Sequence, residues 1–287
     1  MDNAKPVIEI ENLSFTYSTA EKPALKHISL IIYEGEYVAL LGLNGAGKTT
    51  LQLCLNAVIP HMIVGEKEGT VKIFGMDTEE YPPRELAKMI GLVFDNPEFQ
   101  LSQMSVAEEI ALGLENLGVA TADMHKIIKD SLQSVGLSGM EERSPFALSG
   151  GQQQRLSIAS ALAMQPKILV MDEPTSNVDP IGKEEIFAVA AKLNKENKIT
   201  VIMAEHEVEV MAAYADRIIV LNDGEVVFNG TPVEVFSNVE LLDKIGLRVP
   251  QVTELVHLLK EKHALKLAEQ YPVTIDQAEA IFKQRLS

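Results

Sequence analysis

Residues 36–58 read EYVALLGLNGAGKTTLQLCLNAV, and this stretch decides the fold. An apolar run typical of a buried strand, 36–41, precedes a glycine-rich loop, 42–47, and a helical segment follows from Lys48 to about Val58. The loop and the next two residues fit the pattern GxxxxGK(S/T), in which backbone N–H groups wrap phosphates at the N-terminus of a helix. The alternative is a glycine-rich turn with an incidental lysine, which would need neither the strand before it nor the helix after it.

We expect the chain to bind ATP and Mg²⁺ through this loop. Lys48 should reach the β and γ phosphates, and the hydroxyl of Thr49 should hold the Mg²⁺ ion. The predicted ATP-binding residues of the loop and the first helical turn are Gly42, Asn44, Gly45, Ala46, Gly47, Lys48, Thr49 and Thr50.

Two adjacent carboxylates, Asp172 and Glu173, follow the apolar run 168–171. This position is the C-terminal edge of a buried strand, where α/β sheets place their ligand crevice. Asp172 suits the Mg²⁺ shell, and Glu173 suits the attacking water, because a carboxylate beside the metal can orient and deprotonate that water. The alternative is an acidic pair that merely caps a strand, which the phosphate loop elsewhere in the chain disfavours.

A second predicted anion-binding site is the segment Leu148-Ser-Gly-Gly-Gln152, which precedes a helical stretch of small and apolar residues, 156–164. Ser149, Gly150 and Gly151 would place unpaired N–H groups at the start of that helix. An ordinary serine N-cap with a glycine turn explains such a short pattern equally well.

The remaining patterns predict an α/β fold, a P-loop NTPase core with an antiparallel β subdomain, a helical insertion and a small helical C-terminal extension. Strands are expected at 7–17, 24–33, 36–41, 70–74, 90–94, 167–171, 199–203, 217–221 and, after an Asp223-Gly224 turn, 225–229. Helices are expected at 105–117, at 123–135 and after the Pro82-Pro83 pair, and about 96–165 reads as mostly helical.

The C-terminal part changes to helices after about residue 240. A stripe with spacing i, i+3, i+4, i+7 predicts that one helix face packs on another surface, and its members are Val252, Leu255, Val256 and Leu259. Thr274 and Gln277 predict a capping box before a last helix.

The composition of the chain limits the classes of protein to which it can belong. The formal net charge of −16 argues against a surface that neutralises a phosphate backbone, so we do not expect nucleic acid as a partner. The single cysteine, Cys54, suits a reducing compartment, and the longest apolar runs are shorter than the ~20 residues of a membrane-spanning helix. We therefore expect a cytosolic chain that docks onto any membrane partner without entering the membrane itself.

The order of the motifs resembles the ATPase subunits of ABC transporters over about residues 5–235. These motifs are the phosphate loop, LSGGQ, the apolar run with Asp-Glu and then Glu205-His206. The resemblance implies head-to-tail dimers, in which Ser149 to Gln152 of one subunit close over the γ-phosphate held by the other. It also assigns Ser176, Asn177 and Asp179 to a loop that crosses the dimer interface, where SNVD replaces the more common SALD.

The same resemblance adds two site residues. His206 matches the switch histidine that contacts the γ-phosphate, so the candidate catalytic residues are Glu173, His206 and Lys48. A lone histidine after a strand is otherwise usually solvated. Tyr17 matches the aromatic residue that stacks on adenine, although it also continues the face of Phe15 and could belong to the core.

Asp95 departs from the pattern of the family. It stands where the family carries a glutamine that joins the metal site to the membrane-facing surface. A carboxylate offers Mg²⁺ an oxygen, but it lacks the amide donor and adds negative charge near Asp172 and Glu173. We expect Asp95, which is one methylene shorter than glutamine, to stop short of the metal and act mainly through its charge. Gln100 lies nearby, but its spacing argues against it as a substitute.

Two segments, 93–119 and 245–262, resemble the ATPases of energy-coupling factor transporters, which import vitamins or cobalt and nickel ions. In that group two ATPases, identical or related, sit under a transmembrane coupling protein that holds a substrate-binding membrane protein. The resemblance implies a peripheral location at the cytoplasmic face of the cell membrane. There are two alternatives. The chain could be the ATPase of another ABC importer, or it could be a nucleotide-binding scaffold in which Asp95 impairs hydrolysis. A DNA-repair ATPase would show long heptad arms, and a translation-factor ATPase two phosphate loops.

Two further expectations follow from this organisation. We divide the chain into an ATPase domain, 5–240, and a helical extension, 241–287, which we expect to contact the second subunit. We also expect the surface from Asp95 to Ala107 to receive short helices of a membrane partner, because Phe99, Leu101 and Met104 are apolar. The alternative is that all three belong to the core of the helical insertion.

Overall fold

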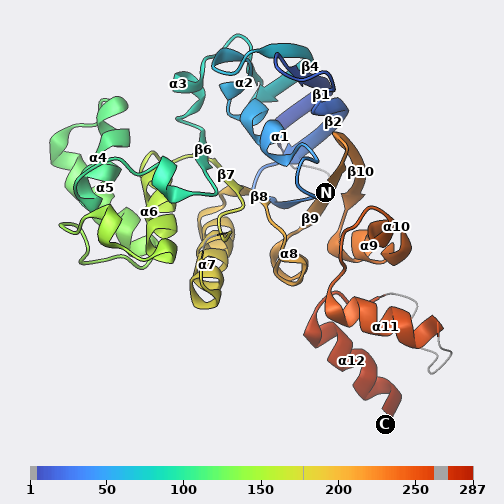
Figure 1. Cartoon of the computed structure of the whole chain (residues 1–287). Helices are drawn as coiled ribbons and strands as arrows, with labels where there is room; N and C mark the ends of the chain where they lie inside the picture. Colours follow the sequence, from blue (N-terminus) through green and yellow to red (C-terminus); the bar gives the residue numbers. More distant parts are fainter. Residues whose placement is uncertain (1–4, 177, 262–270, 287) are drawn as a thin grey trace.

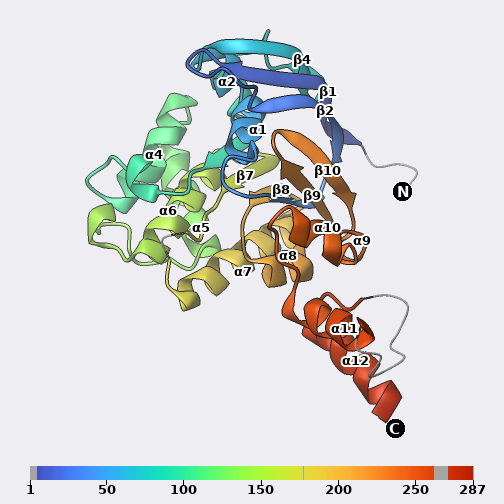
Figure 2. The same cartoon turned by 45° about the vertical axis from the view of Figure 1, so that its right-hand side comes forward.

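The computed structural model describes residues 5–176, 178–261 and 271–286. This part of the chain contains two sheets, a central one and one at the upper edge of the view in Figure 1, with helices between and beside them. Figure 2 shows that α11 (Gln251–Glu261) and α12 (Ile275–Leu286) extend away from the rest of the molecule at the C-terminal end. None of the described helices is long and apolar enough to cross a membrane. The predicted α/β fold class is confirmed.

The first sheet is antiparallel and has the order β2-β1-β4-β5. Its strands are β1 (Pro6–Tyr17), β2 (Leu25–Tyr33), β4 (Gly65–Ile73) and β5 (Met76–Asp77). One face of this sheet is apolar and packs on α1 (Lys48–Leu55), so the predicted antiparallel subdomain covers that helix (Figure 1).

The second sheet carries the order β10-β9-β3-β8-β7-β6, with every pair parallel except β10 with β9. Its strands are β3 (Tyr37–Leu41), β6 (Ile90–Val93), β7 (Ile168–Asp172), β8 (Thr200–Ala204), β9 (Arg217–Asn222) and β10 (Glu225–Gly230). The predicted hairpin turn is present, because Asp223 and Gly224 both have positive φ, 49° and 80°.

The strands of this second sheet each serve two hydrophobic cores. In β3, Val38 and Leu40 pack toward the antiparallel sheet and α1, whereas Tyr37, Ala39 and Leu41 pack toward the helices on the other face. Successive side chains of a strand point to opposite faces, so β7, β8 and β9 divide in the same way. This explains why these strands read as continuous apolar runs.

The helices cover the two faces of the central sheet. Three of them, α4, α5 and α6, build a separate helical subdomain (Figure 1). The bounds of the helices are α1 (Lys48–Leu55), α2 (Val58–His61), α3 (Pro83–Leu86), α4 (Val106–Asn116), α5 (Thr121–Ser134), α6 (Gly150–Ala163), α7 (Pro180–Asn197), α8 (Val208–Tyr214), α9 (Pro232–Phe236), α10 (Val239–Lys244), α11 (Gln251–Glu261) and α12 (Ile275–Leu286). Short 3₁₀ turns lie at η1 (Pro97–Phe99) and η2 (Pro145–Ala147).

Several predicted boundaries were wrong. The helix expected from 48 to about 58 ends at Leu55, because Ala57 takes a left-handed conformation with φ of 55°. The strand expected at 70–74 begins at Gly65, since its polar first half pairs with the end of β1. The helix expected after the two prolines is a single turn, α3, with Pro83 at its first position.

The C-terminal helices follow the predicted pattern only in part. Val256 is fully buried, but Leu255, in the same predicted stripe, remains 47% exposed. At the start of α12 the Thr274 hydroxyl accepts from the N–H of Gln277 at 3.4 Å. The Gln277 side chain accepts from the N–H of Val273 instead of closing the expected reciprocal box. A division at residue 240 would fall inside α10, which joins the larger core through Leu242.

Two glycines with the same backbone conformation allow a test of this packing. Gly69, with φ of +78°, lies so close to β1 that an added Cβ would stand 2.3 Å from the carbonyl oxygen of Asn12. Gly35, with φ of +77°, would meet no heavy atom within 4 Å. We predict that Gly35→Ala costs ~1–2 kcal/mol through left-handed strain alone, and that Gly69→Ala costs ~1–3 kcal/mol more through the clash. Urea unfolding of both variants checks this, and equal losses would contradict it.

Candidate functional site

The glycine-rich loop lies between β3 and α1, as predicted. Gly47 is the N-cap of α1 and has φ of +105°. An added Cβ at this position would stand 2.7 Å from the carbonyl oxygen of Ala24, so only glycine fits. The strand and the helix thus meet in a tight loop whose N–H groups lie at a helix N-terminus.

Lys48 turns its side chain back over the loop and is only 5% exposed. Its Nζ donates to the carbonyl oxygen of Gly42 at 2.9 Å and to that of Leu43 at 3.4 Å. It also lies 3.3 Å from Oε1 of Glu173. The ammonium group is therefore held between the loop and the end of β7.

Thr49 and Asp172 also contact each other between the loop and the end of β7. The Thr49 hydroxyl donates to Oδ2 of Asp172 at 2.7 Å, while Oδ1 of Asp172 is buried and has no hydrogen-bond partner among the described residues. Burial raises the pKa of Asp172, the Thr49 hydrogen bond opposes that shift, and the charges of Glu173 and Asp95 raise it further. An orphan carboxylate oxygen of this kind suits a cation.

Glu173 and His206 come together from the ends of adjacent strands. Glu173 follows β7 with φ of 44°, a left-handed conformation that is uncommon for a residue with a side chain. His206 follows β8, and its Nε2 lies 2.9 Å from Oε1 of Glu173. One carboxylate oxygen therefore contacts both His206 and Lys48.

Lys48, Thr49, Asp172 and Glu173 border a cavity of about 440 Å³, whereas His206 is not among the described residues that line it. This volume suits a small-molecule ligand. The lining residues of the cavity are Tyr17, Ala24, Leu43, Asn44, Gly45, Gly47, Lys48, Thr49, Thr50, Asp95, Asp172 and Glu173. The structure thus brings together most residues of the predicted loop, both adjacent carboxylates, Tyr17 and Asp95.

Tyr17 packs against the core and also lines the cavity. Its ring lies edge-on to the buried Phe15, with 4.9 Å between the ring centroids. Its hydroxyl lies 2.9 Å from the Thr50 hydroxyl oxygen, and the residue is only partly buried. One side of the ring is therefore anchored to the core, and the residue still lines the cavity.

The loop that carries Asp95 is held from several elements, although Asp95 itself is exposed. Gln154 of α6 donates to the carbonyl oxygen of Phe94 at 2.9 Å, and the Ser176 hydroxyl donates to that of Asp95 at 3.3 Å. Gln100 accepts from the N–H of Phe94 at 3.3 Å, so its side chain stabilises the loop itself.

The LSGGQ segment begins α6 and does not line this cavity in the described part of the chain. Ser149 is the N-cap and forms a reciprocal capping box with Gln152. Gly151 allows close packing, because an added Cβ would stand 3.2 Å from a methyl carbon of Val178. Gly150 is the first helical residue. Within one chain, the serine therefore acts as an ordinary cap.

The loop after β7 leads directly into α7. Asp179 is the N-cap of that helix and accepts from the N–H groups of Ile181 and Gly182, both at 3.1 Å. Ser176 is exposed, and Asn177 lies outside the described residues.

Sequence reasoning missed the residues that connect these loops. Gln52 of α1 donates to the carbonyl oxygen of Met171 at 3.0 Å, which ties the helix after the phosphate loop to β7. Arg155 of α6 pairs with Glu185 of α7. Glu205 is 3% exposed and accepts from Thr175 and His206. Glu205 is part of the Glu205-His206 motif, but no role was predicted for it, although a charged residue directly after a fully apolar strand was a signal.

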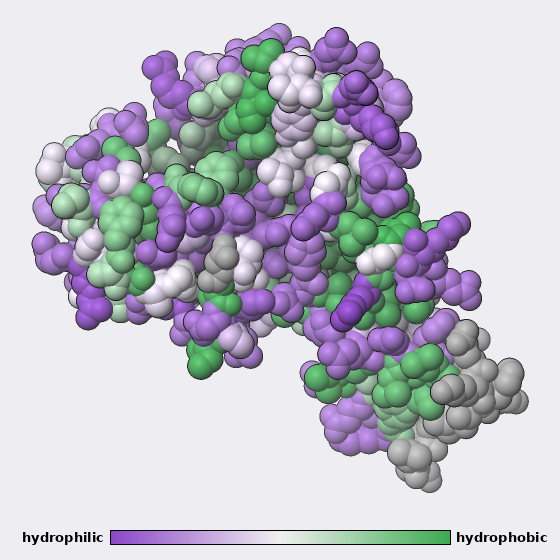
Figure 3. Space-filling model, in the orientation of Figure 1, coloured by the Kyte–Doolittle hydropathy of each residue, from purple (hydrophilic) through white to green (hydrophobic). Residues whose placement is uncertain are grey.

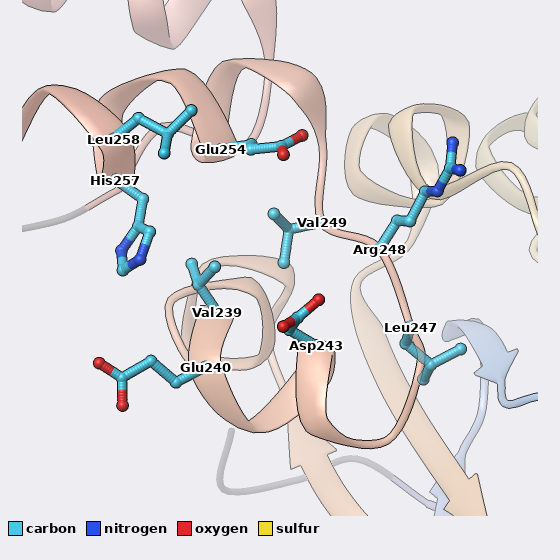
Figure 4. A pocket seen from close by; sticks show the side chains of 9 residues that line it. All are labelled: Val239, Glu240, Asp243, Leu247, Arg248, Val249, Glu254, His257 and Leu258. Atoms are coloured by element: carbon cyan, nitrogen blue, oxygen red, sulfur yellow. The ribbon is translucent and has the colours of Figure 1, made fainter.

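A larger cavity, of about 600 Å³, lies between α10 and α11 (Figure 4). Val239, Val249 and Leu258 border its inner surface, while the charged ends of Glu240 and Arg248 point away in different directions (Figure 4). These charges do not converge as they would on a bound ligand. We interpret this cavity as a gap between α10 and α11 and not as a ligand site.

Comparison with known proteins identifies the family. A sequence model described as ABC transporter matches residues 25–176. A provisionally named ABC transporter ATP-binding protein of Pyrococcus abyssi is 46% identical over 89% of this chain and 91% of that protein. The energy-coupling factor transporter ATP-binding protein EcfA1 of Caldanaerobacter subterraneus subsp. tengcongensis is 43% identical over 89% of this chain and 92% of that protein.

Solved structures agree with this result. CbiO1 from Clostridium perfringens, described as part of the ABC transporter complex CbiONQ, superposes with a TM-score of 0.74 and 31% identity, covering 89% of this chain and 99% of that chain. The ATP-binding cassette MJ0796, a dimer in a post-hydrolysis state with ADP and Pi, superposes with a TM-score of 0.69 and 31% identity, covering 78% and 98%. The chain therefore belongs to the ABC transporter family, as one of its ATP-hydrolysing subunits.

Proposed function

We propose that this ATPase drives an importer of the energy-coupling factor type and takes up a vitamin or a transition-metal ion through membrane partners. The observation that carries the catalytic part is the convergence of Lys48, Thr49, Asp172 and Glu173 at the edge of one cavity. The type of importer rests on the similarity to EcfA1 and to CbiO1, both named as parts of transporters. The expected partners are a transmembrane coupling protein and a substrate-binding membrane protein, on the cytoplasmic face of the membrane.

The residues present fit Mg-ATP. Lys48 and the N–H groups of the loop would bind the phosphates, and Tyr17 would stack on adenine. Thr49 and Asp172 would hold Mg²⁺, because they offer hard oxygen ligands and one Asp172 oxygen is buried without a partner among the described residues. Mg²⁺ usually keeps several waters and takes few protein ligands, so this small set suffices. The bound ion would neutralise charge that develops on the phosphates.

Glu173 would orient and deprotonate the attacking water. Its Oε1 lies between His206 Nε2 and Lys48 Nζ, at 2.9 Å and 3.3 Å, so the carboxylate has a fixed position beside the phosphate loop. His206, which is exposed and whose Nε2 lies 2.9 Å from Oε1 of Glu173, would contact the γ-phosphate. A base held in place in this way contributes ~10²–10⁴ in rate.

Two subunits would complete the site head to tail. The Ser149 to Gln152 segment starts α6 away from the cavity of its own chain, which supports an action on the nucleotide of a second subunit. Ser176, Asn177 and Asp179 would cross the interface between them. The dimeric MJ0796 cassette supports this arrangement.

The C-terminal extension, expected at 241–287, would add a further dimer contact through exposed apolar residues such as Leu255.

The first prediction from this proposal concerns the base. Glu173→Gln should slow ATP hydrolysis by ~10²–10⁴ while ATP still binds, because only the proton acceptor is lost. Lys48→Ala should instead weaken ATP binding. Steady-state hydrolysis and equilibrium nucleotide binding check both variants, with Glu79→Gln, which pairs with Lys67 away from the cavity, as the control. Parent turnover in Glu173→Gln would remove Glu173 from this role.

The second prediction concerns Asp95. Its carboxylate lines the cavity, is exposed, and contributes to the raised pKa of Asp172, so it acts on the site through charge. We predict that Asp95→Gln increases ATP turnover about severalfold, because removing one negative charge near the phosphates lowers repulsion. A magnesium titration of hydrolysis at fixed ionic strength checks this. A higher Mg²⁺ requirement in the variant would instead identify Asp95 as a metal ligand.

The third prediction concerns the membrane-facing surface. Phe99 and Met104 expose 85% and 80% of their surface, whereas Leu101 is buried at 4%, so only the first two are available to a partner. Apolar residues lie among hydrophilic ones over this subdomain (Figure 3). Exposed apolar groups commonly mark docking sites.

We therefore predict that Phe99→Glu with Met104→Glu abolishes co-purification of integral membrane proteins with the tagged chain, while its melting temperature and ATP binding stay unchanged. Met62→Glu, at an equally exposed apolar position (72%) outside the subdomain, serves as the matched control and should leave the complex intact. An intact complex with the double variant would contradict the proposed docking surface.

A further inference from the structure

Glu205 is a buried acidic residue that lies next to the candidate site. It follows β8, exposes only 3% of its surface, and is not among the described residues that line the cavity. Burial raises its pKa, and hydrogen bonds from Thr175 and His206 offset this shift only in part. Because a buried carboxylate is unfavourable unless donors satisfy it, the identity of those donors indicates its role.

Both carboxylate oxygens of Glu205 bind the loops that carry the candidate catalytic residues. Oε1 accepts from the backbone N–H of Thr175 at 3.0 Å and from its hydroxyl at 2.7 Å. Oε2 accepts from the backbone N–H of His206 at 3.1 Å. Thr175 is itself only 1% exposed, so water does not compete for these bonds.

These bonds fix a turn whose backbone is strained. Glu173 has φ of 44°, and its N–H continues the sheet by donating to the carbonyl oxygen of Ala204 at 2.9 Å. Two residues later, Thr175 is tied to Glu205. The turn is therefore held on both sides of Glu173, and the carboxylate of Glu173 ends 2.9 Å from His206.

We propose that Glu205 is a positioning residue that sets the geometry between Glu173 and His206 by holding Thr175 and the His206 main chain. The inference rests on the catalytic roles proposed above for Glu173 and His206. Glu205 acts through other residues, so its loss should affect the chemical step and leave nucleotide binding by the phosphate loop intact. Misplacement of a catalytic group by about 1 Å can cost ~10²-fold in rate.

Three conservative substitutions test this proposal, of which only Thr175→Ser changes the side-chain volume, by one methyl group. In Glu205→Gln, whichever way the amide turns, an NH₂ group faces a backbone N–H that needs an acceptor. Thr175→Val removes only the hydroxyl donor, and Thr175→Ser keeps it. We expect kcat to fall ~10–100-fold in Glu205→Gln and ~10-fold in Thr175→Val, with KM for Mg-ATP within about twofold of the parent. Thr175→Ser should retain the parent kcat.

Glu36→Gln is the matched control at the opposite end of the sheet, where Glu36 accepts from the N–H of Tyr33 at 2.8 Å and pairs with Arg217. It should keep the parent activity. If Glu205→Gln fails to fold, the Thr175→Val and Thr175→Ser pair still decides the question.

Glu173→Gln belongs in the same series, because it separates the two proposals. Parent turnover in Glu173→Gln overturns the catalytic role on which the inference rests. If Glu173→Gln hydrolyses ATP slowly while Glu205→Gln and Thr175→Val both keep the parent kcat, only the positioning role is overturned. A rise in KM that parallels the fall in kcat and in melting temperature would also overturn it, since that pattern indicates a merely structural residue.

Discussion

The parallel register of β3, β8 and β7 is the constraint on which the site depends. Ala204 of β8 pairs with Leu40 of β3 on one side and with Asp172 of β7 on the other, so the three strands end in one row. The phosphate loop begins two residues beyond Leu40, and Glu173 and Glu205 follow directly on their strands. Segments more than 120 residues apart in the chain therefore meet at one edge of the sheet without a long loop to carry them.

This edge concentrates negative charge. Asp172, Glu173 and Glu205 lie at the ends of two adjacent strands, and Asp95 adds a fourth carboxylate that shifts the pKa of Asp172. Lys48 is the cation that contacts Glu173, and the Thr49 hydroxyl and the Thr175 hydroxyl each donate to a neighbouring acid. These hydrogen bonds offset part of the cost of burying the carboxylates, and the pKa values of Asp172 and Glu205 remain raised.

The sequence predicted the parts of this site that depend on local pattern. The loop from Gly42 to Gly47 carries its own signature, and an apolar run followed by two acids locates the end of β7. The contacts of Glu205 could not be predicted, because they depend on the pairing of β7 with β8, which only the folded sheet sets. The break at Ala57 was missed for a related reason, since a left-handed alanine has no local signal and is stabilised by its surroundings.

The helical subdomain shows the same limit. Phe99, Leu101 and Met104 look alike in the sequence, yet Leu101 is buried and the other two are exposed. Spacing alone does not distinguish them, because the segment around η1 is irregular and has no helical or strand period. Likewise, Ser149 reads equally well as a cap or as an anion ligand, and within one chain its geometry is that of a cap.

The alternation of side chains along the central strands has a consequence for how the molecule unfolds. Val38 and Ala39 are neighbours in β3 but belong to different cores, so removing the strand from one core removes it from the other. We therefore expect the central strands to unfold together with both cores, so that opening either core at these strands costs more than opening a loop or a chain end. A nucleotide bound at the end of β3 would stabilise both cores together by mass action, including residues far from any contact with it.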